Sequence, residues 1–400
     1  MIRHGAHDLL PAHADGAANG YPAYRELTEA TVGPYAARFL DGPVRAVDEV
    51  GDGNLNLVFR VRGPASSVVV KQALPYLKAA GRQWPLTRDR AHIEADAIAI
   101  HSRYAPGLLP GIVYFDQAQA AIVLEDLDGY RSWRDILIDG DPSPAVPAQI
   151  GWYSAAILMG TANLAAGERD QLRHRFGYSE LCLVTEDLVF TAPFTGAASN
   201  RYDDELTGLV RALRRDRQLR MAVSGLLSAF KTREETLIHG DLHTGSVLVR
   251  GQQARVIDLE FAYYGPFGFD PGMLLANLAL AYIAHEAVGE LEFCATVAGF
   301  AREYWSALAS GCRQQWSTDE FSCHQFLSAL IADAGRFAGV EMIRRIVGLA
   351  HVQDIDSLPQ PARLRAQQQA VSRGRTLITG PVCRGIDEFW LRATKEGVLG

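Results

Sequence analysis

Two aspartates on either side of a short predicted hairpin are the residues whose spacing best suits chemistry. Asp241 lies in the run Leu-Ile-His-Gly-Asp-Leu-His-Thr-Gly-Ser, and Asp258 ends an apolar run that follows a turn at Gly251. This pattern predicts two strands joined by a turn, which brings the two carboxylates near each other. Such a pair suits phosphoryl transfer, because one carboxylate orients or deprotonates a hydroxyl and the other holds the metal at the phosphates. The alternative is that both aspartates only cap turns.

The same stretch resembles the catalytic loop and metal motif of protein kinases, where His-Arg-Asp-Leu precedes an Asn and Asp-Phe-Gly follows. Residues 239–242 read His-Gly-Asp-Leu, and a glycine in the arginine position is usual in kinases of small molecules such as aminoglycosides and choline. Ser246 stands in the Asn position, and residues 258–260 read Asp-Leu-Glu. Since Mg²⁺ favours carboxylate oxygens, we expect Glu260 to supply the ligand that Ser246 supplies poorly.

The bulk properties are those of an ordinary globular protein with an ample core. The chain has 400 residues, of which 48% are hydrophobic and 21% charged, so one large or two medium domains are expected. A net charge of −7 argues against a general nucleic-acid binder. The five cysteines form no Cys-x-x-Cys pair, which argues against disulfides and zinc and favours a cytoplasmic protein. The first twenty residues do not resemble a signal peptide, and the apolar run at 273–283 is too short to span a membrane.

The pattern of strands predicts a two-lobed α+β protein, with an antiparallel sheet and one helix in the first lobe and a larger, mainly helical second lobe. The expected boundaries are 1–43 for an N-terminal extension with a helix at 24–39, 44–124 for the first lobe, 125–129 for a hinge and 130–400 for the second lobe. Strands are expected at 44–50, 55–62, 68–72, 111–115 and 120–124, with a helix at 89–104.

A glycine-rich turn and a buried lysine in the first lobe suggest a nucleotide site. Residues 51–56 read Gly-Asp-Gly-Asn-Leu-Asn between two strands, where small side chains let backbone N–H groups approach a triphosphate; a plain hairpin turn is the alternative. Lys71 ends an apolar strand and needs a partner if buried. In kinases this lysine contacts phosphates and pairs with a helix glutamate, for which Glu94 is the best candidate and Asp96 the second. The alternative is an edge lysine that reaches solvent.

Trp84 lies in a stretch, 76–86, that we expect to be a long loop. Trp84 either packs on the lobe surface or belongs to a lid near the site. Residues 125–129, Glu-Asp-Leu-Asp-Gly, follow the last strand at once and are expected to form a hinge whose backbone binds a purine.

Helical periodicity dominates after residue 133. Helices are expected at 133–138, 148–165, 203–231 (possibly broken near Arg217), 271–286, 290–310, 318–347 (with a break) and 362–376. The arginines at 211–220 are expected to form a solvated helix face, with polyphosphate or partner contact as the alternative. Asp270-Pro271 is expected to cap its helix. In related kinases an aspartate here also steadies the catalytic loop.

Arg344 and Arg345 are adjacent on an otherwise apolar helix, so they are expected to point to different sides of it. At least one then needs an anionic partner. Either Arg345 pairs with Glu341 at i, i+4, or an arginine faces the substrate or the γ-phosphate.

Taken together, these motifs resemble the 5-methylthioribose kinase family, a branch of the aminoglycoside and choline kinase-like enzymes. The resemblance runs from about residue 47 to residue 351, and the Ser246 and Glu260 departures and the paired arginines are features of that family. It implies transfer of the γ-phosphoryl of ATP to the 1-hydroxyl of 5-methylthioribose in methionine salvage, with ATP and Mg²⁺ required, and a homodimer. Two other classes stay open: a related kinase for an aminoglycoside, choline or homoserine, and a nucleotide-binding module without catalysis.

The resemblance also implies residue roles. Asp241 would be the catalytic base and would contact the sugar, together with Arg344, Arg345 and Trp84. Asp258 and Glu260 would hold Mg²⁺. The nucleotide would be bound by Asn54, Lys71, Glu94, Glu125, Asp126, Leu127, Asp258, Leu259 and Glu260.

Overall fold

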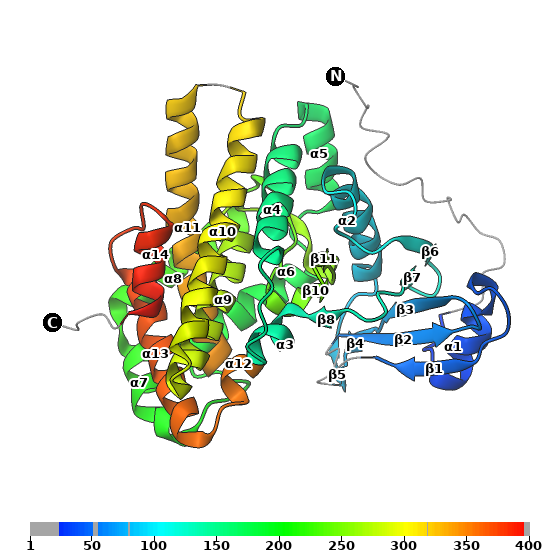
Figure 1. The fold of residues 1–400 in the computed structure, drawn as a ribbon, viewed down its shortest axis with the longest axis horizontal. Helices are drawn as coiled ribbons and strands as arrows, with labels where there is room; N and C mark the ends of the chain where they lie inside the picture. Colours follow the sequence, from blue (N-terminus) through cyan, green and yellow to red (C-terminus); the bar gives the residue numbers. More distant parts are fainter. Residues whose placement is uncertain (1–23, 51–54, 79–80, 318, 396–400) are drawn as a thin grey trace.

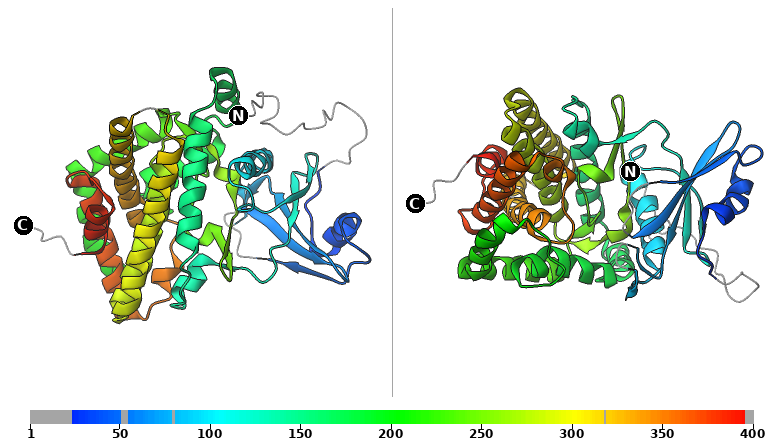
Figure 2. Two further views of the ribbon diagram at one scale, coloured as in Figure 1. Left: turned by 45° about the horizontal axis from the view of Figure 1, so that its top comes forward. Right: turned by 90° about the horizontal axis from the view of Figure 1, so that it is seen from below.

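A computed structural model describes residues 24–50, 55–78, 81–317 and 319–395 of the chain. A five-stranded sheet occupies one end of the molecule and a group of long helices the other, and α2 (Arg90–Tyr104) lies between them (Figures 1 and 2). This is the two-lobed α+β arrangement that the sequence predicts.

The sheet is antiparallel with the strand order β1-β2-β3-β7-β6. All five predicted strands are confirmed, with ends that differ by at most two residues from the prediction. Lys71 sits on the central strand, opposite Val58 on one side and Ile122 on the other. The strands are Ala46–Glu49 (β1), Asn56–Arg62 (β2), Ser67–Ala73 (β3), Ile112–Asp116 (β6) and Ala121–Glu125 (β7).

Two predictions about this lobe are wrong in part. The N-terminal helix is shorter than expected, because α1 spans only Glu29–Ala36 and one 3-10 turn, Ala37–Phe39 (η2), follows it. The stretch at 76–86 is not an open loop, because Tyr76–Leu77 (β4) and Gly81–Pro85 (β5) pair as a small antiparallel hairpin. The expected helix at 89–104 is confirmed by α2.

The hairpin expected between the two aspartates is confirmed. Val247–Arg250 (β10) pairs with Gln253–Val256 (β11), and Arg131–Ser132 (β8) adds a third strand. A second small ladder joins Thr236–Ile238 (β9), just before the catalytic loop, to Tyr263–Gly265 (β12), just after the Asp-Leu-Glu segment. The two ladders therefore fix both ends of the segments that carry Asp241 and Asp258.

The second lobe is built from long helices, several of which lie side by side in both figures. Glycines allow close crossings: a Cβ on Gly151 of α4 would lie 2.4 Å from the carbonyl oxygen of Tyr304 in α10. The helices that match predicted ones are Trp133–Ile138 (α3), Val146–Ala162 (α4), Thr207–Arg215 (α7), Arg217–Thr232 (α8), Phe269–Val288 (α9), Leu291–Gln315 (α10), Glu320–Val347 (α11) and Gln360–Thr379 (α13).

Most of the predicted helices are confirmed, including the break near Arg217, where Asp216 caps α8 by accepting from the Leu219 N–H at 3.0 Å. The break expected within 318–347 is wrong, because α11 is continuous from Glu320 to Val347. Shorter elements were not predicted: Ala166–Arg175 (α5), Glu180–Thr185 (α6), a π-helical turn Glu186–Thr191 (η3), 3-10 turns Ala192–Phe194 (η4) and Asp204–Leu206 (η5), Gln353–Asp356 (α12) and Ile386–Thr394 (α14).

All five cysteines are free and buried. The arginines at 211–220 are exposed except Arg214, which is half-buried and whose guanidinium lies over the Tyr202 ring. Among the described residues, no helix combines the length and the apolar character that a bilayer span requires.

Candidate active site

The catalytic loop follows β9 and is held by hydrogen bonds to its own backbone. Asp270, in the first turn of α9, accepts from the N–H groups of His239 at 2.7 Å and Gly240 at 3.0 Å. The helix-capping role expected for Asp270 is wrong, because Gly268 precedes the helix and Asp270 lies inside it. The loop-steadying role is confirmed. A 3-10 turn (η6, Thr244–Ser246) closes the loop.

The Ser246 side chain forms hydrogen bonds within the catalytic loop. Its hydroxyl lies 3.1 Å from the carbonyl oxygen of Asp241 and 2.9 Å from that of His243, and it accepts from the His243 N–H at 2.9 Å. The position that holds a metal-binding Asn in protein kinases therefore serves here to close the turn.

Gly240 allows the two key segments to touch. Its φ is +84°, in the left-handed region that favours glycine. A Cβ at this position would lie 2.1 Å from the carbonyl oxygen of Phe261. The arginine found here in protein kinases would collide with the chain just after Glu260, so glycine is a steric requirement of this close approach.

Asp241 faces positive and hydrogen-bonding groups. The His243 Nε2 lies 3.5 Å and the Arg344 Nη2 3.7 Å from its carboxylate oxygens. Burial opposes ionisation of Asp241, but His243 and the arginines Arg345 and Arg344 outweigh it, so the pKa of this carboxyl is held well below its usual range. Asp241 is thus ionised and can accept a hydrogen bond from a hydroxyl.

His243 is a site residue that the sequence analysis did not identify. Its Nδ1 accepts from the N–H groups of Gly245 at 3.0 Å and Ser246 at 3.1 Å, so the proton of the neutral ring sits on Nε2, toward Asp241. Burial lowers the pKa of His243 to about 4 despite the nearby Asp241, so the ring is neutral near pH 7. The sequence His-Gly-Asp-Leu-His places a histidine two residues on either side of Asp241, and this pattern could have identified His243.

Lys71 joins the sheet to the Asp-Leu-Glu segment. The Nζ of this buried lysine lies 2.8 Å from Glu94 Oε1, 2.6 Å from Asp258 Oδ1 and 3.7 Å from Glu260 Oε1. The predicted pair with Glu94 is confirmed; Asp96, the second candidate, pairs instead with Arg175. Burial disfavours the charge on Lys71, but the three carboxylates outweigh it and raise its pKa above the usual range.

Asp258 is the carboxylate of this cluster that reaches the open side. Its side chain is 49% exposed, whereas those of Glu94 and Glu260 are 3% and 6% exposed. Asp258 adopts a left-handed backbone conformation with φ 65°, which is strained for a residue with a Cβ. Such strain is typical of functional sites and here turns the carboxylate toward Lys71.

Glu260 is held by residues that the sequence analysis did not single out. Asn56 Nδ2 donates to both carboxylate oxygens at 2.9 Å. Arg90 Nε lies 3.4 Å from Glu260 and 3.2 Å from the Asn56 Oδ1 that accepts from it. The rest of the Arg90 guanidinium donates to backbone carbonyls, including that of Leu74 at 2.6 Å. Glu260 is therefore a fixed, buried charge rather than a mobile side chain.

The charges around Lys71 bear on whether a divalent cation fits. Three carboxylates, those of Glu94, Asp258 and Glu260, face the two positive charges of Lys71 and Arg90, which leaves an excess of negative charge. The pKa of Glu94 is raised, first because the group is buried. Asp258 is open and fits a metal ligand; Glu260 is close but is turned toward Asn56. Among the described residues, no group of three or more acidic, histidine or cysteine side chains is arranged as a metal site. A cation would therefore need oxygens from the phosphates as well.

The paired arginines were expected to point to different sides of α11, and this prediction is wrong. Both bind Glu341: Arg344 through Nε, and Arg345 through Nε at 2.7 Å. The two alternatives for this pair are therefore compatible, because Arg344 also approaches Asp241.

The remaining predicted site residues lie as follows. Glu125 ends β7 and accepts from the Gly111 N–H at 3.0 Å, and Asp126 is buried and pairs with Arg60 at 2.9 Å. Leu127 is buried, as is Leu259. Trp84 packs at the edge of a small apolar cluster of Leu77, Leu86 and Leu181, which spans both lobes. Asn54 and the rest of the glycine-rich turn up to it, residues 51–54, lie outside the described residues.

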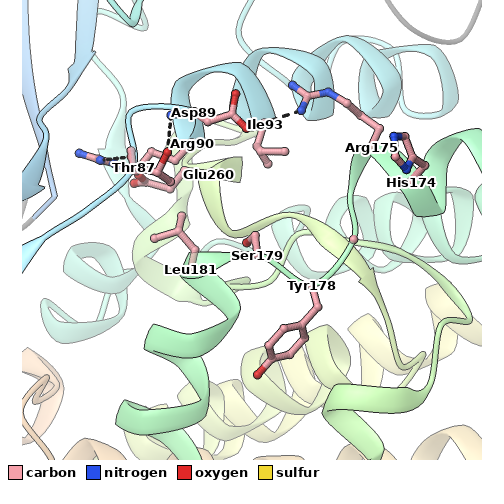
Figure 3. Close-up of a pocket in the computed structure, with 11 residues that line it drawn as sticks. Thr87, Asp89, Arg90, Ile93, His174, Arg175, Tyr178, Ser179, Leu181 and Glu260 are labelled. Carbon is pink, nitrogen blue, oxygen red and sulfur yellow. Dashed lines mark hydrogen bonds and ion pairs between the residues drawn. The ribbon is translucent and has the colours of Figure 1, made fainter.

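A pocket of about 170 Å³ lies behind Glu260 and Arg90, on the side of α2 (Figure 3). Figure 3 shows Arg90 and Glu260 on one side of it and His174 and Arg175 on the other. Neither Lys71 nor Asp241 lines it, so of the carboxylates described above only Glu260 borders this pocket.

Fold and site together define a phosphotransferase with a kinase-like catalytic loop. The model of a phosphotransferase enzyme family matches residues 46–306. The chain is 39% identical over 396 residues to a methylthioribose kinase of Pectobacterium atrosepticum, covering 94% of this chain and 99% of that protein. It is 39% identical over 376 residues to a methylthioribose kinase of Yersinia pseudotuberculosis, covering 89% and 92%. The chain therefore belongs to the methylthioribose kinase family.

Solved structures are more distant. The chain is similar to spectinomycin phosphotransferase with a TM-score of 0.47 and 11% identity, over 92% of this chain and 99% of that one.

Proposed function

We propose that this protein is an S-methyl-5-thioribose kinase, which transfers the γ-phosphoryl of ATP to the 1-hydroxyl of 5-methylthioribose and so acts in methionine salvage. The observation that carries the phosphotransferase assignment is the 2.6 Å contact of Lys71 with Asp258, which joins a phosphate-binding lysine of one lobe to a metal-side aspartate of the other. The sugar is proposed from the names of the relatives, since side chains alone do not identify it.

Nucleotide binding is assigned by position. Lys71, held by Glu94, would contact the α- and β-phosphates. The adenine would lie against the backbone of residues 125–127, because the side chains of Glu125 and Asp126 are already engaged within the protein. Asn54 would add a phosphate contact. Mg²⁺ would be held by the open carboxylate of Asp258 together with phosphate oxygens, and by Glu260 through lone pairs that Asn56 does not use. It would neutralise the charge that develops on the phosphates.

In the chemical step Asp241 accepts a hydrogen bond from the sugar 1-hydroxyl and orients it. The bond from O1 to the γ-phosphorus forms as the bond from that phosphorus to the β,γ-bridging oxygen breaks, ADP leaves, and the hydroxyl proton passes to Asp241. Because the pKa of Asp241 is held low, its main contribution is orientation, and proton transfer comes late, as suits a loose transition state. Arg344 and Arg345 balance the charge of the transferred group.

Two other functions were left open by the sequence. A polycationic aminoglycoside, or choline, would meet Arg344 and Arg345 beside Asp241, and like charges at short range are unfavourable. A module without catalysis would have no need of the low pKa of Asp241 or of the strained Asp258.

A coupled ADP-release assay with Mg·ATP tests the substrate. We expect turnover of 5-methylthioribose in preference to choline, homoserine and kanamycin. Equal or faster turnover of any of those three would reject the sugar while leaving the kinase assignment intact.

The domain boundaries, the homodimer and the cytoplasmic location stay predictions. Size-exclusion chromatography with light scattering tests the homodimer, for which a mass near 87 kDa, twice the 43.7 kDa chain, is expected.

A further inference from the structure

Adjacent residues on an α-helix point about 100° apart, so two neighbouring arginines normally diverge. In α11 the carboxylate of Glu341 brings the two neighbouring arginines together instead. Glu341, three and four residues earlier, accepts from the Nε of Arg344 and from the Nε of Arg345, so both guanidinium groups turn to the same side. The Arg344 Nη2 then lies 3.7 Å from Asp241 Oδ1, and Arg345 Nη1 lies 3.5 Å from the carbonyl oxygen of His351.

The carboxylate that holds the pair is itself fixed. Glu341 is fully buried, and Asn277 of α9 donates to its Oε1 at 3.2 Å. The Asn277 amide oxygen in turn accepts from Arg134 Nη2 at 2.8 Å. Glu341 is thus anchored by a second helix, and its position does not depend on the two arginines alone.

The charges also favour an anionic ligand. Glu341 binds both buried guanidinium groups through their Nε atoms, and the second positive charge is balanced by Asp241, which forms a looser ion pair with Arg344 Nη2 at 3.7 Å. A buried charge without close compensation is costly, and a phosphoryl group carrying negative charge would supply the compensation. The Nε atoms are occupied by Glu341, so the terminal nitrogens are the ones directed away from it.

We propose that Glu341 is a positioning residue that converts Arg344 and Arg345 into one convergent pair, aimed at the phosphoryl group as it reaches the hydroxyl held by Asp241. The proposal rests on the proposed function. By this proposal Glu341 accelerates the chemical step through the two arginines and contributes little to binding of the uncharged sugar.

The test compares Glu341→Gln, Arg344→Gln and the double variant. We expect Glu341→Gln to lower kcat at least tenfold with the KM for the sugar within threefold. In the Arg344→Gln background the same change should lower kcat less than threefold, because residues that act as a unit are non-additive. By calorimetry, Glu341→Gln should weaken binding of the sugar 1-phosphate at least tenfold and binding of the sugar less than threefold.

The matched control lies on the same helix. Asp333 pairs with Arg233 at 2.6 Å, well before the paired arginines in sequence, so Asp333→Asn removes a carboxylate from a half-buried ion pair of the same helix. This variant should keep kcat and KM within twofold. Additive effects of Glu341→Gln and Arg344→Gln on kcat, or a loss of stability in Glu341→Gln with kcat unchanged, would overturn the proposal.

Glu341→Gln leaves two buried guanidinium groups without a counter-ion and can fail to fold. Glu341→Gln with Arg345→Gln keeps the net charge of the wild-type cluster and is compared with Arg345→Gln alone. Arg344, the arginine that approaches Asp241, is present in both of these variants and still depends on Glu341 for its position. At least a tenfold lower kcat in the double variant therefore supports the proposal, and equal kcat values refute it. If the wild type does not use 5-methylthioribose, the proposed substrate fails, and the comparison is made with whichever substrate the wild type phosphorylates.

Discussion

Replacing Gly240 with alanine perturbs the point where the catalytic loop touches the Asp-Leu-Glu segment. The φ of +84° is unfavourable for alanine by about 1–2 kcal/mol. The new Cβ would also lie 2.1 Å from the Phe261 carbonyl oxygen and 2.7 Å from its carbonyl carbon, where real contacts stay above 3.0 Å. The two backbones must therefore separate by roughly 1 Å, at a further cost of about 1–3 kcal/mol.

Asp241 directly follows Gly240, and Glu260 directly precedes Phe261, so this separation moves the two acidic segments apart. A displacement of roughly 1 Å at a reacting centre costs about 100-fold in rate. We expect Gly240→Ala to lose about 100-fold in kcat/KM in the coupled ADP-release assay, and about 2–5 kcal/mol of unfolding free energy in urea.

Gly251→Ala is the matched control. Gly251 also has a positive φ, +59°, but a Cβ there would meet no atom within 4 Å. This variant should lose about 1–2 kcal/mol of unfolding free energy and keep kcat/KM. A folded Gly240→Ala enzyme with kcat/KM within threefold of wild type would refute the idea that this close approach positions the site.

Three further predictions concern buried charges. Burial, with His239 nearby, lowers the pKa of His101 to about 3, whereas the unfolded value is about 6.5. The unfolded chain therefore gains a proton as pH falls below 6.5 while the folded chain does not, so about 2 kcal/mol of unfolding free energy is lost between pH 7 and 4.5. Urea unfolding of His101→Gln should show a smaller loss over the same pH range. A loss equal to that of the wild type would contradict the role given to His101. Arg90→Met should lower the unfolding free energy by about 3–5 kcal/mol, because it strands the buried Glu260; a loss below 1 kcal/mol in urea would mean that the carboxylate is compensated otherwise. Lys71→Met should weaken ATP binding by calorimetry roughly tenfold or more, and unchanged affinity would remove Lys71 from the nucleotide site.

Local patterns made much of the fold predictable. The five strands and the β10–β11 hairpin follow from short apolar runs bounded by glycine turns, since such signals are carried by neighbouring residues. The Lys71–Glu94 pair was predictable because a lysine on a buried strand needs a counter-ion from the helix that packs on it.

The elements that were missed depend on contacts between distant parts of the chain. A break was expected within 318–347, but α11 is continuous and Gly339 within it faces the carbonyl oxygen of Gly374 in α13, where a Cβ would come within 2.5 Å. These glycines permit a close helix crossing, and tertiary packing outweighs their low helix propensity. The β4–β5 hairpin has too few residues to show the alternation of apolar and polar side chains that marks a strand.

The same holds for the site. The motif identified Asp241, Asp258 and Glu260, but the partner of Glu260 is Asn56, 204 positions away. Asn56 ends the glycine-rich motif, but nothing local shows that it binds Glu260, and no local pattern marks Arg90, whose bond to Asn56 spans 34 positions. Asp270 appeared to be a helix cap, since its bonds to the catalytic loop cross 30 and 31 positions.

The central claim, that Asp241 orients the hydroxyl that attacks the γ-phosphoryl group, is tested most directly by Asp241→Asn. Single-turnover transfer from Mg·ATP to 5-methylthioribose should fall about 1,000-fold, while ATP affinity measured by calorimetry stays within threefold of wild type. Transfer at the wild-type rate by the folded Asp241→Asn protein would contradict the account.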